Sequence, residues 1–124
     1  MTNILAIAFG GALGAVARYL SSQWVYATLG KSFPFGTLFV NVVGSFAMGV
    51  LAVLLIERLA FAPEVRAFLL IGFLGSFTTF STFSLETVNL LGSGEVLKAG
   101  INIIISVFVC VAACWMGMIL GRQL

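Results

Sequence analysis

The segment GFLGSFTTFSTFSLE, residues 72–86, places hydroxyl groups among phenylalanines in a chain that is otherwise apolar. Its six hydroxyl side chains are Ser76, Thr78, Thr79, Ser81, Thr82 and Ser84. Because hydrocarbon cannot hydrogen-bond a hydroxyl group, a membrane segment this polar must face protein or water. Phe77, Phe80 and Phe83 recur every three residues through the same run. The segment is therefore predicted to line a path across a membrane, with hydroxyls and aromatic rings side by side.

The composition of the whole chain is that of a membrane protein. The 124 residues are 61% hydrophobic and 8% charged, with a mean hydropathy of +1.20. Soluble domains carry about 25% charged residues, so this surface is predicted to face mostly lipid. A helix needs about 20 apolar residues to cross a hydrocarbon core of about 30 Å. We predict one all-α transmembrane domain, residues 1–124, with four spans at about 3–20, 36–56, 67–91 and 99–120. No Lys or Arg precedes the first span, which favours a membrane helix over a signal peptide.

The residue inventory argues against several functional classes. There is no histidine, and the two cysteines, Cys110 and Cys114, are too few for a zinc or haem site. On a helix these two residues stack four apart on one face, so no disulfide is expected. Paired carboxylates and a phosphate-binding glycine loop are also missing, so no enzyme is predicted. The net charge of +2 has no basic cluster, which argues against nucleic acid as a partner.

The third span is predicted to be broken near the middle of the membrane. Gly72, Gly75 and the pair Thr78–Thr79 are poor helix formers at its centre. Interrupted membrane helices free backbone carbonyls and amides, which then serve as ion ligands. The alternative is a continuous helix whose hydroxyls bond back to carbonyls four residues earlier. Six hydroxyls within nine residues fit the broken helix better.

The loop charges bear on orientation in the membrane. With four spans, both termini and the loop between spans two and three share one side. That side holds Arg58, Arg66 and Arg122, while the other side holds Arg18, Lys31 and Lys98. Orientation follows the Lys/Arg asymmetry of the loops, and here it is nearly absent. We therefore predict insertion in both orientations and an antiparallel, dual-topology homodimer with two-fold symmetry. The alternative is a single orientation set by something other than loop charge.

Polar residues in spans two and four extend the candidate site. Asn41 offers an amide that can either donate to an anion or hold two helices together. Span four carries a weakly polar stripe with a spacing of four residues: Asn102, Ser106, Cys110 and Cys114. Residues at this spacing share one helix face. The stripe is either the lining of a pore or a seam between helices.

Two charged residues have alternative interpretations. Glu86 is the one acidic residue that can lie at membrane depth, where carboxylates are costly and usually functional. It can equally sit near the membrane interface and bond polar neighbours. Arg18 either anchors the helix at the interface or attracts anions at a vestibule. The residue types alone leave both choices open.

Three segments of this sequence resemble the Fluc (CrcB) family of fluoride channels. They are GGALGAVARY at 10–19, FGTLFVNVVGSF at 35–46 and GFLGSFTTFSTFSLE at 72–86. The match runs through the first three spans in order, and TTFSTFSLE is highly specific. The resemblance implies a dual-topology homodimer in the cell inner membrane with two narrow pores. Such a channel passes fluoride passively and protects a microbe from accumulated fluoride.

The resemblance also implies roles for individual residues. The family's pore asparagine corresponds to Asn41, and its two pore phenylalanines correspond to Phe80 and Phe83. Its hydroxyl track corresponds to Ser81, Thr82 and Ser106. A structural sodium ion at the dimer centre would be held by the backbone carbonyls of Gly75 and Thr78. Arg18 would lie toward the aqueous vestibule.

This sequence departs from the family pattern at two places. Ser76 stands where many members have a second glycine, and Cys110 and Cys114 stand where hydroxyl residues are common. Thiols are weaker donors than hydroxyls, so the span-four part of the track is the least secure. Small multidrug transporters are a rival class, but they need a carboxylate in span one, which has none. A proton-coupled antiporter that uses Glu86 and a scaffold subunit without transport are two further rival classes.

Overall fold

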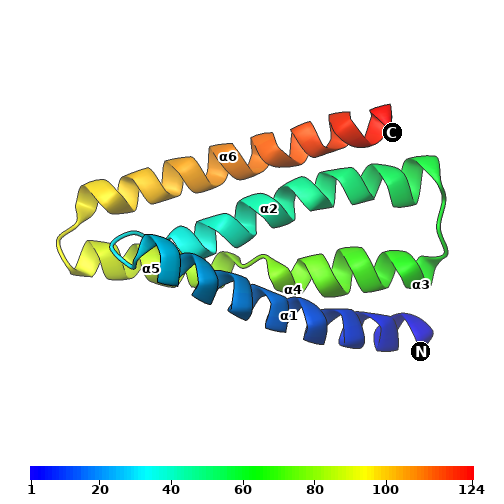
Figure 1. Cartoon of the computed structure of the whole chain (residues 1–124), viewed down its shortest axis with the longest axis horizontal. Helices are drawn as coiled ribbons and strands as arrows, with labels where there is room; N and C mark the ends of the chain where they lie inside the picture. Colours follow the sequence, from blue (N-terminus) through cyan, green and yellow to red (C-terminus); the bar gives the residue numbers. More distant parts are fainter.

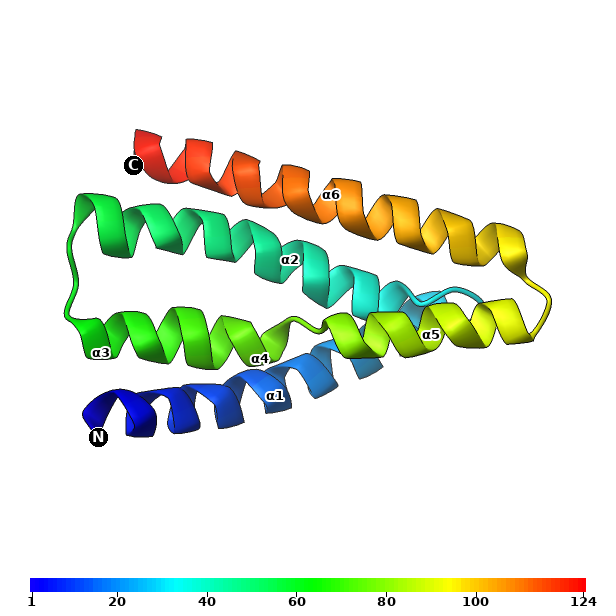
Figure 2. The same cartoon turned by 180° about the vertical axis from the view of Figure 1, so that it is seen from behind.

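The computed structural model describes all residues 1–124 and is entirely helical. Four helical segments are long and apolar enough to cross a membrane: Thr2–Leu29, Phe35–Arg58, Pro63–Gly92 and Val96–Gln123. They run alternately in opposite directions, and both termini lie at the same end of the molecule (Figure 1). Figure 2 shows the same arrangement from behind. The prediction of an all-α chain is confirmed, as is that of four helical segments long and apolar enough to span a membrane.

The first helix is longer than the predicted span. α1 covers Thr2–Leu29, nine residues beyond the predicted end at Leu20. The polar residues after Leu20 are compatible with a helix. Val25, in this added part of α1, is buried against the rest of the protein at 3% exposure. The helix ends at Gly30, whose φ of 86° lies in the left-handed region that glycine adopts freely. At 1.5 Å per residue α1 is about 42 Å long, so it exceeds a hydrocarbon core of about 30 Å.

The second and fourth segments pack closely along their length. α2 (Phe35–Ala52) continues into η1 (Val53–Arg58), a π-helical stretch, and α6 covers Val96–Gln123. A Cβ atom on Gly49 would collide with the Cys114 carbonyl, and one on Gly117 would collide with the backbone of α2. Membrane helices associate through such close backbone contacts, because lipid provides no hydrophobic drive between them. Glycine therefore sets the α2–α6 distance.

The third segment consists of several pieces. It begins with α3 (Pro63–Arg66), continues as the π-helical η2 (Ala67–Leu74) and α4 (Gly75–Phe77), and ends with α5 (Phe80–Gly92). Thr78 and Thr79 separate α4 from α5 in an extended conformation, with ψ angles of 157° and 119°. Figure 2 shows this link as a short stretch of coil between the two helices. The backbone groups around the link must therefore find partners other than the regular helical ones.

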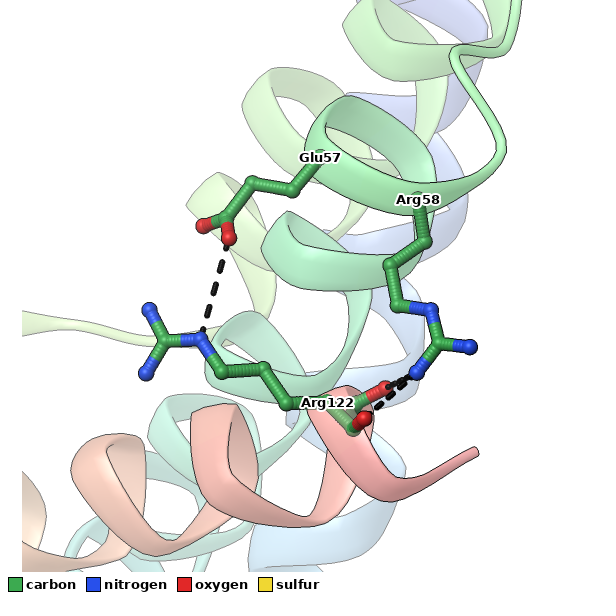
Figure 3. A network of polar contacts seen from close by, with 4 residues as sticks. Glu57, Arg58 and Arg122 are labelled. Atoms are coloured by element: carbon green, nitrogen blue, oxygen red, sulfur yellow. Dashed lines mark hydrogen bonds and ion pairs between the residues drawn. The ribbon is translucent and has the colours of Figure 1, made fainter.

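Side chains join the ends of the second and fourth segments (Figure 3). The Arg58 guanidinium donates to the carbonyls of Gly121 and Arg122, and Arg122 Nε lies 3.7 Å from Glu57 Oε1. The last carbonyls of a helix lack intrahelical partners, so Arg58 acts as a cap for α6. The Glu57–Arg122 pair is about half exposed, and an exposed pair of this kind contributes at most about 1 kcal/mol.

The helix ends also locate the basic residues. Arg58 ends η1, Arg66 ends α3 and Arg122 lies near the end of α6, while Lys31 follows α1 and Lys98 lies near the start of α6. The first three of these helix ends lie at the end of the molecule that holds both termini, and the other two lie at the opposite end (Figure 1). Arg18 does not end the first helix as expected, because α1 continues to Leu29. When Arg18 is left out, three basic residues lie at the end of the molecule with the termini and two lie at the opposite end.

Candidate functional site

The Asn41 side chain bonds directly to the backbone at the interruption of the third segment. Asn41 Nδ2 donates to the Thr79 carbonyl at 3.0 Å, and the Thr79 amide donates to Asn41 Oδ1 at 2.7 Å. In a continuous helix that amide would donate to the carbonyl of Gly75. Asn41 therefore joins α2 to the interruption, as the helix-holding interpretation expected. Its Nδ2 carries a second hydrogen, which no protein group accepts and which is available to a ligand.

Local hydroxyls stabilise both sides of the interruption. The Thr79 hydroxyl accepts from the Thr82 amide at 3.2 Å and so caps the start of α5. Thr78 Oγ1 donates to the Leu74 carbonyl at 3.0 Å, and Ser84 Oγ donates to the Phe80 carbonyl at 2.9 Å. The last two bonds are the back-bonds to carbonyls four residues earlier that the continuous-helix alternative expected. The six hydroxyls thus do not share one role.

A pocket of about 300 Å³ lies between α2, α5 and α6. Among its lining residues are six of the candidates predicted from the sequence: Asn41, Thr78, Phe80, Phe83, Ser106 and Cys110. We call this pocket the neutral pocket, because none of its ten lining residues is charged. The candidates come from three different helices and from the link between α4 and α5, so the tertiary fold brings together residues that are far apart in the sequence.

The two phenylalanines of the neutral pocket differ in exposure. Their ring centroids are 5.2 Å apart, and the ring planes are inclined by 53°. Phe83 is buried at 8% exposure, whereas Phe80 is 71% exposed. Inclined rings present both an edge and a face to a shared space, and the edge of an aromatic ring is its positive part. Protein therefore encloses the Phe83 ring, whereas most of the Phe80 side chain faces away from the rest of the chain.

The remaining candidates lie outside the neutral pocket. Thr82, Arg18 and Glu86 line a second pocket of about 240 Å³, which we call the charged pocket. Ser81 is exposed, and its Oγ lies 3.4 Å from the Thr79 hydroxyl. The Cys114 carbonyl lies against Gly49 in the α2–α6 seam. The predicted hydroxyl track is therefore divided, with Ser106 in one pocket and Thr82 in the other.

Glu86 bonds a polar neighbour and keeps one oxygen free. Tyr26, near the end of α1, donates its hydroxyl to Glu86 Oε2 at 2.8 Å. Glu86 Oε1 is buried without a protein partner. Although Arg18 lines the same charged pocket, it forms no ion pair with Glu86. Glu86 also borders a larger cavity of about 640 Å³ at the end of the molecule that holds Lys31.

Backbone oxygens near the interruption are the candidate metal ligands. The chain has no group of three or more His, Cys, Asp or Glu side chains that could hold a metal ion. The Gly75 carbonyl loses its regular helical partner, because the Thr79 amide donates to Asn41 instead. The extended conformation of Thr78 takes its carbonyl out of the helical ladder too. These oxygens suit a hard cation such as sodium, which unwound membrane helices coordinate with backbone carbonyls.

The structure adds polar residues that the sequence interpretation did not single out. Ser45 of α2 lines the neutral pocket. Thr87 of α5 lies in a buried chain of hydrogen bonds with Asn102 and Ser106 of α6. The stripe on α6 is therefore a helix seam at Asn102 and a pocket wall at Cys110, and Ser106 belongs to both. A lone serine or threonine in a membrane helix gives little signal, because it can bond its own backbone.

The family model described as CrcB-like protein, Camphor Resistance (CrcB), matches residues 5–118. The chain is 55% identical over 122 residues to the Fluoride-specific ion channel FluC of Methylococcus capsulatus, covering 98% of this chain and 54% of that protein. It thus spans about half the length of that relative. Proteins with the same name from Hydrogenovibrio crunogenus and Geobacter metallireducens are each 50% identical. Those matches cover 98% and 100% of this chain and 92% and 100% of the relatives. The shared name is that of an ion channel and not of an enzyme, and the chain belongs to the CrcB family.

Proposed function

We propose that this protein is a passive, fluoride-selective channel formed by two antiparallel copies, which exports fluoride across the cytoplasmic membrane. The main support is the neutral pocket, where Asn41, Phe80 and Phe83 converge from two helices. The relatives match nearly all of this chain and are named fluoride-specific ion channels, which supports the choice of ion.

The donors of the neutral pocket suit a small anion that must be both bound and released. Fluoride holds its water tightly, so a pore must offer replacement hydrogen-bond donors at short range. Asn41 has a free N–H there, and Ser45 and Ser106 add hydroxyls. A fixed lysine in the pocket would hold the anion too strongly, whereas conduction needs sites that the ion can leave. Neutral donors meet both requirements.

The aromatic rings are proposed to complete the ion path in the dimer. An anion passing Phe80 or Phe83 meets the positive ring edges, a contact weak enough for transit. Since Phe80 is 71% exposed in one copy, we infer that the antiparallel second copy covers it and closes the pore wall. A second copy would also cover part of the many apolar side chains exposed on the helices.

The interruption is proposed to lie near the middle of the membrane and at the centre of the dimer. Thr78 and Thr79 are close to the midpoint of the segment Pro63–Gly92, which supports this depth. The carbonyls of Gly75 and Thr78 would hold a sodium ion there, with the second copy supplying the same two oxygens. When bound, such an ion supplies a central positive charge that offsets part of the desolvation cost of fluoride.

The charged pocket is proposed as the approach to the pore. Arg18 there has no acidic partner, so its charge is free to attract anions from a vestibule. Thr82 lines the same pocket and Ser81 lies nearby, and their hydroxyls can take over hydration of the ion. The nearly balanced loop charge supports insertion in both orientations, as the antiparallel dimer requires.

Efflux from liposomes that contain only this protein tests the proposal. Fluoride is loaded inside, and its release is followed with a fluoride electrode, with and without a proton gradient. We expect release that the gradient does not alter. Release that requires a proton gradient would instead support the antiporter. The absence of any release would support the scaffold subunit.

A further inference from the structure

A chain of three hydrogen bonds links α5 to α6, and each bond has only one possible direction. Thr87 Oγ1 lies 2.8 Å from the Phe83 carbonyl, which can only accept, so Thr87 must donate. The Thr87 oxygen then accepts from Asn102 Nδ2 at 2.9 Å. This contact fixes the orientation of the Asn102 amide, and its Oδ1 faces Ser106 Oγ at 3.3 Å. Because an amide oxygen only accepts, Ser106 must give its single hydrogen to Asn102.

Burial keeps this chain of bonds closed to water. The exposures of Thr87, Asn102 and Ser106 are 6%, 2% and 7%. A buried polar group that loses its partner is costly, so each bond supports the next. Only Ser106 lines the neutral pocket, whereas Asn102 and Thr87 do not. Any influence of Asn102 on an ion in the pocket therefore passes through Ser106.

We propose that Asn102 is a positioning residue that sets how strongly fluoride binds at Ser106. The inference rests on the proposed function. Ser106 can donate to an anion in the neutral pocket only by withdrawing its hydrogen from Asn102 Oδ1, so binding exchanges one hydrogen bond for another. At 3.3 Å the bond to Asn102 is longer than the usual 2.5–3.0 Å of a hydroxyl bond, so it yields to a better acceptor. The exchange weakens fluoride binding without preventing it, as conduction requires.

The substitution Asn102→Leu tests this role, because leucine has a similar size and no acceptor. Ser106 is then free to donate to the ion without losing a partner. We expect the fluoride concentration for half-maximal flux to fall about threefold, the order of one net hydrogen bond. In the Ser106→Ala background, the same substitution is expected to change nothing further. A purely structural effect of leucine would persist in that background.

Thr87→Val provides a second route to the same result, in case Asn102→Leu does not assemble. Valine removes the acceptor that orients the Asn102 amide. The amide is then free to turn its N–H groups toward Ser106, which releases the serine hydrogen. The expected shift has the same sign and is smaller. Thr28→Val is the matched control, since Thr28 also donates to a carbonyl four residues earlier but makes no hydrogen bond to Asn102.

Different results would contradict fluoride conduction and the role of Asn102. Wild-type protein that releases no fluoride contradicts the proposed function itself. The inference about Asn102 is overturned if wild-type protein conducts but neither Asn102→Leu nor Thr87→Val lowers the half-maximal concentration. It is also overturned if Asn102→Leu has the same effect with and without the Ser106 hydroxyl. A shift that Thr28→Val reproduces would overturn it as well.

Discussion

The neutral pocket and the charged pocket share Thr79 but differ in the chemistry of their walls. The neutral pocket offers an amide, hydroxyls, a thiol and two phenyl rings, with no charged side chain. The charged pocket contains both Arg18 and Glu86. A fixed charge attracts an ion over several ångströms, whereas neutral donors act only at contact. We therefore expect the charged pocket to attract the ion, and the neutral pocket to replace its water and then release it.

Replacing the phenyl rings of the neutral pocket should have the largest effect. Phe80→Ile and Phe83→Ile keep an apolar side chain but remove the positive ring edges. We expect each to abolish fluoride efflux from liposomes while the dimer still assembles, as measured by gel filtration in detergent. Undiminished flux in both variants would remove the rings from the ion path, and the contrast between the pockets would lose its basis.

Asn41→Leu should also block transport, and it should weaken the fold. Leucine leaves the Thr79 amide and carbonyl without their partners, which costs about 2–6 kcal/mol if both remain unsatisfied. We expect a lower thermal unfolding midpoint together with lost efflux. Asn89→Leu is a matched control on α5, because the Asn89 side chain makes no hydrogen bond and lies outside the neutral pocket. Full transport by Asn41→Leu would reduce Asn41 to a link between helices.

The two cysteines allow a chemical test of which space conducts. Cys110 lines the neutral pocket, while the Cys114 backbone packs against Gly49. A small methanethiosulfonate reagent that reaches Cys110 should obstruct the pocket and inhibit most of the flux. Cys110→Ala should protect against the reagent, and Cys114→Ala should not. Protection by Cys114→Ala instead would place the ion path along the α2–α6 seam.

Arg18→Gln should produce the smallest change, because it alters attraction and leaves the neutral pocket intact. We expect flux at low fluoride and low ionic strength to fall about threefold. The loss should fade in about 1 M salt, where the screening length is about 3 Å. Arg66→Gln removes the same charge outside the charged pocket and should have no effect. A loss that persists in high salt would mean that Arg18 acts by contact.

The four helices were predictable from sequence, but their ends were not. About 20 apolar residues in a row leave little choice but a membrane helix, so all four segments were found. The end of the first helix was not predicted correctly, because the polar residues Ser21, Ser22 and Gln23 are typical of a loop but are tolerated in a helix. The π-helical stretches η1 and η2 have no signal in the hydrophobic pattern of the sequence.

From the residue pattern alone, the candidate site was predictable where a polar residue stands out in an apolar segment, whereas Phe80 and Phe83 were predicted through the family resemblance. Asn41 and Ser106 stood out in this way, and both line the neutral pocket. That Asn41 pairs with the backbone of Thr79 depends on two helices meeting, which no local pattern encodes. Thr87 was not found, since its hydroxyl also has an ordinary bond within its own helix. Roles in conduction remain predictions for all of these residues.

Ion selectivity, measured on one liposome preparation, is the sharpest test of a fluoride channel with a neutral ion path. Vesicles that contain only this protein are loaded with equal concentrations of fluoride and chloride, and the release of each ion is followed with its own electrode. We predict fast release of fluoride while chloride is retained, because the neutral donors of the pocket suit the smaller ion. Equal release of both ions, or retention of both, would contradict this proposal.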